Sequence, residues 1–464
     1  MEVYKIDQLK NLIQSAHVNF LIGSGLSRPY LSTLGPIENL LTEVQLLKDS
    51  VAKTIVEVSL LAKYFSSVMA PCAKIGNLSK KEASNLKVVL DGYSNFLSLW
   101  NSIIARRSSS LLDKTINIFT TNIDNILELV AEGAKLEFND GFRGHYNPVF
   151  HEDSFSNVVS KVSPHYQNTS KIPVFNYLKI HGSINWNKCA SDETAITYDR
   201  ELELIAEIED ALQSIPQEVL LPLEEFKSDD YSQWLTILKE KAEAVLKNKG
   251  KDELECLEEA LESFRKAYFR LVMIHPRKAK FRESVLDMHF YELMRIYSNT
   301  LEKSGSVLFV MGFSFADEHL AQLTIRAANS NPTLHVIVFA FDEVGKADIK
   351  SNIAKGGMNY NNNICIISPS DFYRVQDEGL RDRLNKNGFV ITSGKVDVEK
   401  ANHPDNNLEV DNSAQIKTSP ETASDIVDEK ESADNAEHTV NPETVFSLDN
   451  INTYVFANLG RLIF

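Results

Sequence analysis

Cysteine is scarce in this sequence of 464 residues, which contains four widely spaced cysteines. No two of them form the C-x-x-C spacing that is typical of zinc and dithiol sites. We therefore expect isolated, reduced thiols. The sequence offers no compact cluster of metal ligands elsewhere, so a metal cofactor is not expected. The cysteines are Cys72, Cys189, Cys256 and Cys365.

The sequence also lacks a long apolar run. Residues 1–10 do not contain the apolar stretch of a signal peptide, and no segment approaches the ~20 apolar residues of a membrane span. Acidic residues outnumber basic ones by 64 to 48, and the net charge of -16 disfavours direct binding to nucleic-acid phosphates. With 43% hydrophobic and 24% charged residues, the composition is that of a globular protein. We expect a cytoplasmic location without membrane contact.

Aromatic residues are absent between Val390 and Val445. Asp, Glu, Asn, Ser and Lys dominate there, so residues 390–445 are predicted to form a disordered acidic linker that cannot bury enough apolar area to fold. Residues 446–464 regain aromatic and aliphatic side chains. We expect this last segment to dock on another subunit or a partner, with folding back onto its own domain as the alternative.

Strands and helices alternate over most of the remaining chain, which predicts an α/β fold with a Rossmann-like parallel sheet. Two stretches with helical spacing, 36–114 and 200–268, interrupt the alternation as insertions, and the charge-rich second one is expected to form solvated helices outside the core. The predicted helices are 6–16, 123–131, 285–303 and 318–328. The predicted strands are 18–22, 116–120, 174–180, 271–274, 307–310, 334–340 and 364–367.

A glycine turn follows the first predicted strand. The residues Gly23, Ser24, Gly25 and Ser27 lie where glycines let a backbone approach a ligand and where backbone N–H groups can face a phosphate. Arg28 stands where a full G-x-G-x-x-G motif has its third glycine, so the common dehydrogenase fingerprint is not met. A tight turn without ligand is the alternative.

The second motif, Thr120-Thr121-Asn122-Ile123-Asp124, follows a strand at its carboxyl end, the edge of an α/β sheet where ligands usually bind. Asn122 offers a donor and an acceptor, and Asp124 adds a carboxylate. Both residue types are also ordinary helix caps, so a capping role remains open here.

Two further motifs end strands in the same way. His181 follows the strand 174–180 and precedes a glycine, which can leave the imidazole open to a cleft and able to take a proton from a ribose hydroxyl. Gly312 and Ser314 follow the strand 307–310, and the serine hydroxyl could bind ribose or phosphate.

In this order the four motifs resemble the sirtuin family and, more narrowly, the sirtuin-like domains of bacterial antiphage defence proteins. The resemblance spans about residues 18–342 and implies that residues 1–389 form one sirtuin-like catalytic domain. It implies that Asn122 and Asp124 face the nicotinamide ribose of NAD, that Asn122 places the attacking group and that His181 acts as base. The residues implied to line the phosphates, the adjoining ribose and the adenosine half are Gly23, Ser24, Gly25, Ser27, Thr121, Gly312 and Ser314.

The sequence departs from the deacylating sirtuins in three places. Thr121 stands where they commonly carry glutamine, Arg28-Pro29-Tyr30 replaces their glycine, proline, Phe-Arg segment, and their four-cysteine zinc module is missing. We therefore expect an NAD glycohydrolase that releases ADP-ribose and nicotinamide and depletes NAD in antiphage defence.

Two other functions remain as alternatives, namely a deacylase or ADP-ribosyltransferase and a non-catalytic nucleotide-binding assembly subunit. The resemblance also implies a homo-oligomer and a partner such as a HerA-type ATPase or an Argonaute-like protein.

Overall fold

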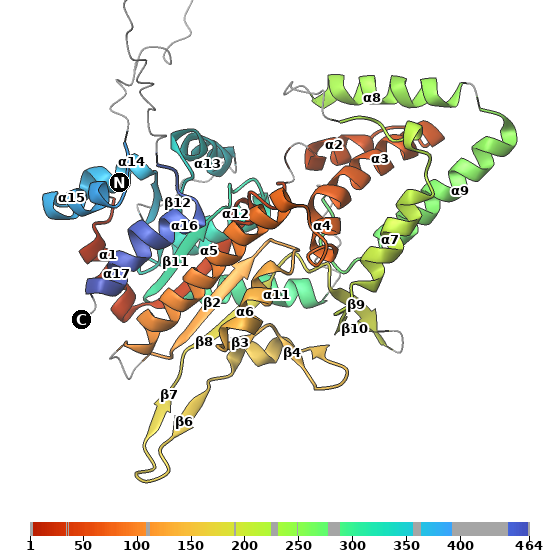
Figure 1. The fold of residues 1–464 in the computed structure, drawn as a ribbon. Coiled ribbons are helices and arrows are strands. Elements are labelled where there is room, and N and C mark those ends of the chain that lie inside the picture. Colours follow the sequence, from red (N-terminus) through yellow and green to blue (C-terminus); the bar gives the residue numbers. More distant parts are fainter. Residues whose placement is uncertain are drawn as a thin grey trace, which may run out of the picture.

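A seven-stranded parallel sheet forms the centre of the protein, as a computed structural model shows (Figure 1). The strand order is β13-β12-β11-β1-β2-β8-β3, and this arrangement confirms the predicted α/β, Rossmann-like fold. The strands are β1 (His17–Ile22), β2 (Thr115–Thr120), β3 (Glu137–Asn139), β8 (Val174–Lys179), β11 (Ser306–Met311), β12 (His335–Phe339) and β13 (Ile364–Ile367). The structure describes residues 3–33, 35, 37–107, 112–189, 192–223, 231–247, 249–276, 288–355, 363–391 and 444–462.

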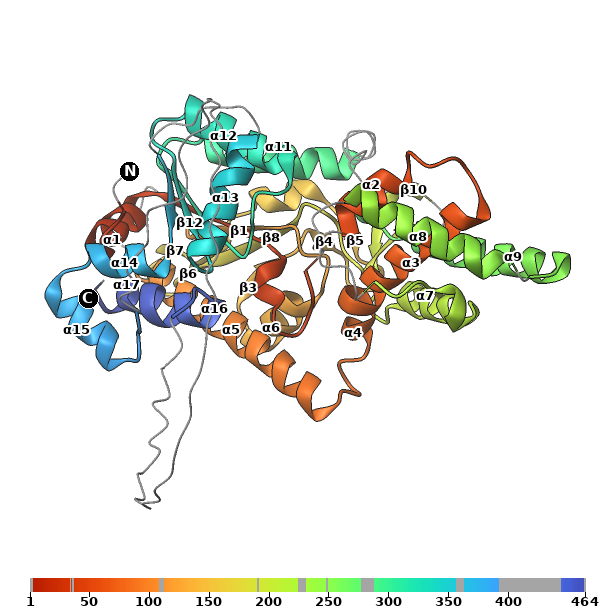
Figure 2. The same ribbon diagram turned by 90° about the horizontal axis from the view of Figure 1, so that it is seen from above.

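Helices cover both faces of this sheet, because its strands carry apolar side chains on alternate sides. Phe20 and Ile22 of β1 belong to one apolar cluster, and Leu21 between them belongs to another. Figure 2 shows α5, α6 and α17 on one side of the sheet and α11, α12 and α13 on the other. These helices are α5 (Lys80–Ala105), α6 (Ile126–Ala134), α11 (Met288–Glu302), α12 (Glu318–Ser330), α13 (Glu343–Lys355) and α17 (Ala457–Leu462), with α1 (Ile6–Ser15) beside α17.

The long helix α5 corrects the expectation for residues 36–114. Phe96 and Trp100 of α5 lie against Phe20 of β1 with ring centroids 5.0 and 4.9 Å apart. Because these large side chains are fully buried on the sheet, α5 is a helix of the Rossmann core and not part of an insertion.

The two insertions form one helical bundle, although some 130 residues separate them in sequence. Helix α3 contacts α8 and α9, and α7 packs along α9 (Figure 1). The second insertion is therefore not a set of solvated helices outside the core, since Leu238, Leu261 and Phe264 are completely buried in it. The bundle helices are α2 (Ile37–Val44), α3 (Val51–Tyr64), α4 (Ala70–Ala73), α7 (Glu203–Gln213), α8 (Tyr231–Leu246) and α9 (Lys251–Tyr268).

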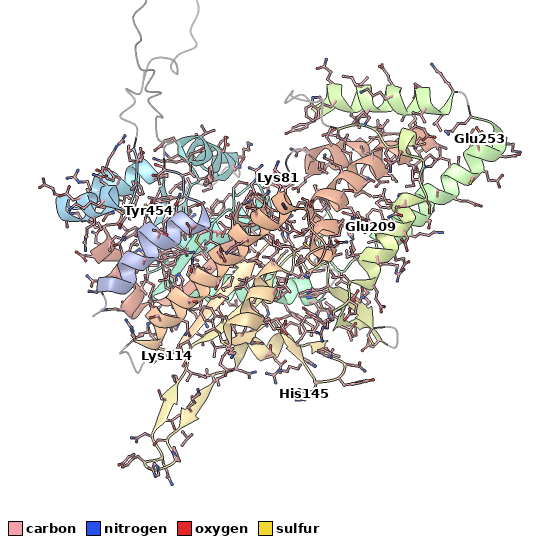
Figure 3. All side chains as sticks on the ribbon, viewed as in Figure 1. Lys81, Lys114, His145, Glu209, Glu253 and Tyr454 are labelled. Atoms are coloured by element: carbon pink, nitrogen blue, oxygen red, sulfur yellow. The ribbon has the colours of Figure 1, made fainter. Side chains whose placement is uncertain are left out.

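Charged residues lie on the outside of this bundle, as expected. Glu253 is exposed at the start of α9 and points away from the body of the molecule (Figure 3). Glu209 of α7 pairs with Lys74, which follows α4, at 2.5 Å.

One stretch of the chain, Val51–Ala73, is long and apolar enough by composition to cross a membrane. It comprises α3, a π-helical turn over Phe65–Met69 and α4. Most of this stretch is buried inside the bundle, which is the behaviour of a core helix in a soluble protein.

The predicted strand at residues 271–274 is wrong. Met273 makes a single antiparallel bridge to Gly182, and no sheet strand forms there within the described residues. The segment instead crosses the end of β8, where the Ile274 N–H donates to the His181 carbonyl at 2.9 Å. Leu271 and Val272 are buried in this position although they do not belong to the sheet. Their apolar character therefore reflects burial alone.

Smaller strands extend beyond the central sheet. A four-stranded sheet has the order β4-β5-β10-β9, and β6 and β7 form a separate two-stranded hairpin that projects from the body (Figure 1). These strands are β4 (Phe142–Arg143), β5 (Val149–Phe150), β6 (Ser160–Val162), β7 (Thr169–Lys171), β9 (Trp186–Cys189) and β10 (Asp192–Tyr198).

Four asparagines cross the central sheet in register. Asn117 of β2 donates to Asn19 of β1 at 2.9 Å, and Asn176 of β8 donates to Asn117 at 2.9 Å. Asn139 of β3 continues the row by donating to Asn176 at 3.0 Å. The row supplies hydrogen-bond partners for four polar side chains within the sheet, which removes most of the cost of burying them.

The C-terminal segment folds back onto its own chain, which is the second of the two alternatives for residues 446–464. Phe456 is fully buried against Phe20, Phe96, Trp100 and Phe309. Docking on another subunit through these side chains is therefore not what the structure shows. The segment contains α16 (Leu448–Asn450), a π-helical turn over Ile451–Phe456 and α17. Residues 392–443, on which most of the predicted linker falls, lie outside the described residues.

Candidate functional site

The four sequence motifs meet at the carboxyl ends of β1, β2, β8 and β11. Ile22 pairs with Thr120 and with Met311, and Thr120 pairs with Lys179, so these strands end at nearly the same level. The chain proceeds from β1 to β2 on one side and later returns to β11 on the other side of β1. Such a reversal of strand order opens the crevice in which α/β proteins bind ligands.

The two glycine turns at this edge pack against each other. A Cβ atom on Gly23 would lie 2.4 Å from the Gly312 carbonyl oxygen, and Gly312 itself has a φ of +63°. The N–H groups of Gly23 and Gly25 donate to the carbonyls of Met311 and Gly312 at 3.0 Å. These two donors are thus already used within the protein, and the glycines are required by the close approach of the turns.

Ser27, Asn122 and Asp124 form a buried hydrogen-bond network. The Ser27 hydroxyl donates to Asp124 Oδ2 at 2.8 Å and accepts from Asn122 Nδ2 at 3.1 Å. Asp124 Oδ1 accepts from the Ile126 N–H at 3.1 Å at the start of α6. Asp124 therefore binds the backbone N–H of the first residue of α6, whose N-cap residue is Asn125, and also links the first two motifs.

Asn122 has one unsatisfied group in this network. Its side chain is 5% exposed, and its Oδ1 has no hydrogen-bond partner among the described residues. A buried acceptor without a donor is costly, on the order of 1–3 kcal/mol, and is satisfied when a ligand or water supplies a hydroxyl.

Tyr93 of α5 lies beside the same network, a contact that no sequence motif indicates. Burial and the Asp124 carboxylate raise the pKa of Tyr93, while the neighbouring polar side chains of Ser27 and Asn122 oppose that rise. The phenol therefore stays protonated, and α5 contributes a neutral hydroxyl to the site.

A buried ion pair supports the network from the β8 side. Lys179 Nζ lies 2.7 Å from Glu128 Oε1 and also donates to the Asp124 carbonyl. Burial raises the pKa of Glu128, and the neighbouring Lys179 opposes this shift. Cys72 of α4 is buried nearby, and burial followed by the charge of Asp124 raises its pKa well above the usual range. This thiol therefore stays protonated.

His181 has a different partner, which the sequence motifs did not include. Its Nε2 lies 3.1 Å from Oδ2 of Asp317, the residue that precedes α12, and both side chains are 13% exposed. Gly182 allows this arrangement with a φ of +76°, and a Cβ there would lie 2.2 Å from the Val272 carbonyl. In the sequence, Asp317 lies three positions after Ser314 and has the residue type of a helix N-cap. This position indicates the start of a helix, but it does not indicate a contact with a histidine.

The remaining expected site residues lie at the same edge but outside these networks. Thr121 is partly buried and its N–H donates to the Ile22 carbonyl at 3.2 Å. Ser24 and Ser314 are exposed at the two glycine turns, where a ligand that approaches from the solvent could contact them. No hydrogen bond or ion pair joins His181 to the Ser27 network within the described part of the chain.

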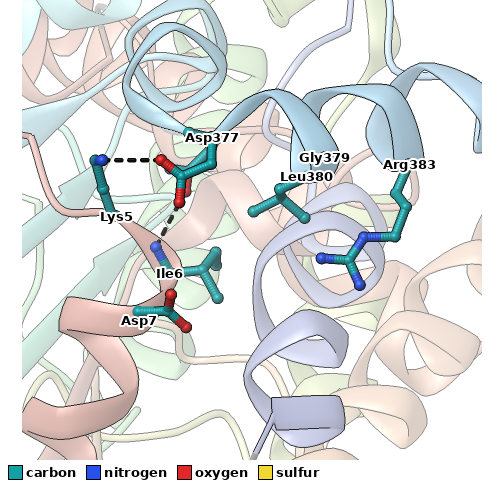
Figure 4. A pocket seen from close by; sticks show the side chains of 8 residues that line it. Lys5, Ile6, Asp7, Asp377, Gly379, Leu380 and Arg383 are labelled. Atoms are coloured by element: carbon teal, nitrogen blue, oxygen red, sulfur yellow. Dashed lines mark hydrogen bonds and ion pairs between the residues drawn. The ribbon is translucent and has the colours of Figure 1, made fainter.

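Two pockets formed by the described residues lie away from the strand ends. One, of about 300 Å³, lies where Lys5 pairs with Asp377 between α1 and α15 (Glu378–Lys386), as Figure 4 shows. The other, of about 590 Å³, lies between α5 and the C-terminal segment and is lined by Asn95, Ser98 and Asn452. Neither includes a residue of the four motifs.

The described residues contain no group of three or more His, Cys, Asp or Glu side chains that could hold a metal ion. A scan of protein-family models finds no match to this sequence, and a search of curated proteins finds none either.

Proposed function

We propose that this chain is an NAD glycohydrolase that cleaves NAD to ADP-ribose and nicotinamide. The observation that carries the proposal is Oδ1 of buried Asn122, which has no partner among the residues that the structure describes, because a ribose hydroxyl is a donor that would satisfy it. His181 stands at the end of the neighbouring strand β8, where an imidazole can take a proton from water or a hydroxyl. The likeness of the four motifs to sirtuin-like defence domains gives NAD as the substrate.

In this reaction the main task of the protein is to position the substrate and the attacking water. The bond between ribose C1′ and the pyridinium nitrogen breaks, and its electron pair leaves with neutral nicotinamide. Water bonds to C1′ and gives up a proton, for which His181 is the base. Asn122 holds a ribose hydroxyl, and Asp124 acts as a positioning residue because its oxygens fix Ser27 and the start of α6. The leaving group is already positively charged, so this cleavage needs no metal.

The glycine turns would face the rest of the dinucleotide. We assign the phosphates and adjoining ribose to Gly23, Ser24, Gly25, Ser27 and Thr121. We assign the adenosine half to Gly312 and Ser314. Because the Gly23 and Gly25 N–H groups are used within the protein, close backbone approach and the exposed Ser24 and Ser314 hydroxyls would make these contacts.

NAD depletion by this chain would serve antiphage defence in a cytoplasmic homo-oligomer. We propose that a partner, such as a HerA-type ATPase or an Argonaute-like protein, restrains or triggers the activity, since uncontrolled loss of NAD would harm the host.

Product analysis tests the proposed function. The purified full-length chain is incubated with NAD, alone and with a candidate partner, and nicotinamide and ADP-ribose are separated by chromatography. We expect both products without any acyl-lysine peptide. Nicotinamide release that requires such a peptide would indicate a deacylase, and ADP-ribose attached to protein would indicate a transferase. NAD binding by calorimetry without turnover in any arm would indicate a nucleotide-binding subunit.

A further inference from the structure

The contact between His181 and Asp317 joins two distant strands of the sheet. His181 follows β8 and Asp317 follows β11, and the strands β2 and β1 lie between them. Three strand spacings amount to about 14 Å, yet the two side chains lie 3.1 Å apart. The turns after β8 and β11, together with the two side chains, therefore bridge the ends of β1 and β2. This contact spans the edge at which the substrate would bind.

Asp317 is itself held firmly by α12. Its Oδ1 accepts from the N–H groups of His319 and Leu320 at 3.0 and 3.1 Å, which makes Asp317 the N-cap of a 13-residue helix. The other oxygen, Oδ2, is the one that faces His181. In these contacts, one oxygen of the carboxylate caps α12 and the other faces His181.

We propose that Asp317 is a positioning residue that keeps the proton of neutral His181 on Nε2 and leaves Nδ1 as the basic atom. Oδ2 of an ionised Asp317 faces Nε2 at 3.1 Å, and a carboxylate attracts an N–H there and repels a lone pair. The proton of a neutral imidazole is therefore favoured on Nε2, and Nδ1 then carries the lone pair. Within the described residues, the contact of Nε2 with Asp317 is the one polar contact found for the His181 ring. This inference rests on the proposed function for its catalytic consequence but not for the tautomer.

The proton balance follows from this assignment. When water attacks C1′, its proton moves to Nδ1 of His181 while the electron pair of the broken bond leaves with nicotinamide. The resulting imidazolium keeps its Nε2–H on the Asp317 carboxylate, and this opposite charge stabilises it. Asp317 does not need to take the proton.

The variant Asp317→Asn separates positioning from capping. Asparagine caps a helix as well as aspartate does, so α12 should remain intact. Its Nδ2, however, donates to Nε2 and would move the imidazole proton to Nδ1, which blocks the base. We expect kcat to fall on the order of 1000-fold or more, with KM changed by less than about threefold.

The experiment combines kinetics with NMR of the full-length chain labelled with ¹⁵N-histidine. The His181 signals are assigned by their loss in His181→Gln, and the ring nitrogen shifts report the tautomer. We expect the Nε2–H form in the natural protein and the Nδ1–H form in Asp317→Asn. A matched control is Glu152→Gln, because Glu152 contacts His289 in a second histidine–carboxylate pair, outside the site. That variant should change the His289 signals and leave those of His181, and kcat, as they were.

The outcomes separate the two proposals. An unchanged His181 tautomer in Asp317→Asn, or an unchanged kcat in an active enzyme, would overturn the role of Asp317. A loss of kcat that only accompanies a lower Tm would reduce Asp317 to a helix cap. If the natural protein shows no NAD cleavage, the proposed function fails, and the NMR shifts still decide whether Asp317 sets the tautomer.

Discussion

At the scale of single residues, Asn122 combines a structural donor with an unsatisfied acceptor. Its Nδ2 donates to Ser27, and its Oδ1 has no hydrogen-bond partner in the part of the chain that the structure describes. We predict that Asn122→Ala lowers kcat for NAD cleavage on the order of 100-fold, because the ribose loses its acceptor. The lost bond to Ser27 should lower the free energy of unfolding by about 1 kcal/mol. Nicotinamide release and denaturant unfolding measure the two effects.

Asn117→Ala is the matched control for this variant. Asn117 lies in the row of asparagines within the sheet and bonds to Asn19 and Asn176, away from the strand ends. Its removal should lower the free energy of unfolding by at least as much as that of Asn122 and leave kcat within about twofold. Turnover by Asn122→Ala at the rate of the natural protein would remove Asn122 from the mechanism.

His335 makes stability depend on pH. Burial lowers the pKa of this half-buried imidazole, whose Nδ1 lies 2.7 Å from the Tyr4 hydroxyl. Because the pKa is about 6.5 in the unfolded chain, the unfolded state binds more protons as the pH falls. The contribution of neutral His335 is therefore complete above about pH 6.5 and is lost as the pH falls from there through its folded-state pKa.

We predict that His335→Gln flattens the decline of unfolding free energy between about pH 7 and pH 5, as measured by urea unfolding at several pH values. The exposed His165 provides the control, since His165→Gln should leave the slope unchanged. Equal slopes for His335→Gln and the natural protein would show that protonation of His335 is not linked to unfolding.

The site residues could be predicted where local sequence determines them. Asn122 and His181 lie at strand ends because a β-branched, apolar run precedes each, and parallel strands end at one edge. Asp317 and Tyr93 could not be predicted as members of the site. Their contacts depend on a contact between the ends of two distant strands and on where α5 lies, and neither feature has a local sequence signal.

At the scale of elements, the C-terminal segment fills one face of the sheet. Phe456 contacts aromatic rings from β1, β11, β12 and α5. We predict that Phe456→Ala lowers the free energy of unfolding by about 3–5 kcal/mol, since it leaves a cavity among rings that cannot close over it. Denaturant unfolding followed by circular dichroism measures this loss.

Tyr146→Ala serves as the control for Phe456→Ala, because Tyr146 is 93% exposed and its loss should change stability by less than about 0.5 kcal/mol. Light scattering adds a second test. If Phe456→Ala changes the mass of the assembly but not the stability of the protomer, the segment contacts another subunit in solution.

The elements themselves were mostly predictable, and the exceptions have one cause. Strands β1, β2, β8, β11, β12 and β13 are apolar runs between helices, as the sequence indicates. The sequence gives wrong predictions for residues 271–274 and for helix α5, because the apolar character of a run does not reveal which part of the protein will cover it. In both cases the decisive contact comes from a part of the chain that is distant in sequence.

At the scale of the whole molecule, an ion pair links the two insertions into one bundle. Arg265 Nε of α9 lies 3.1 Å from Oε2 of Glu57 of α3, and the glutamate side chain is only 4% exposed. We predict a coupling energy of roughly 1–3 kcal/mol from the double-mutant cycle of Glu57→Gln and Arg265→Met, measured by denaturant unfolding.

The control cycle uses Arg295 and Glu292, which pair at 2.5 Å within the exposed surface of α11. Pairs of that kind contribute below about 0.5 kcal/mol. A Glu57–Arg265 coupling no larger than that of the control pair would show that this ion pair does not help to hold the insertions together.

The return of residues 444–462 to the sheet also affects how the protein is made. Strands β1 and β11 are synthesised long before Phe456, which covers Phe20 and Phe309 in the finished fold. A growing chain therefore presents bare aromatic surface on the ribosome until the segment arrives, and such surface attracts chaperones or promotes aggregation. The same delay means that a truncated translation product lacks a complete core, so the protein acquires its stable form late in its own synthesis.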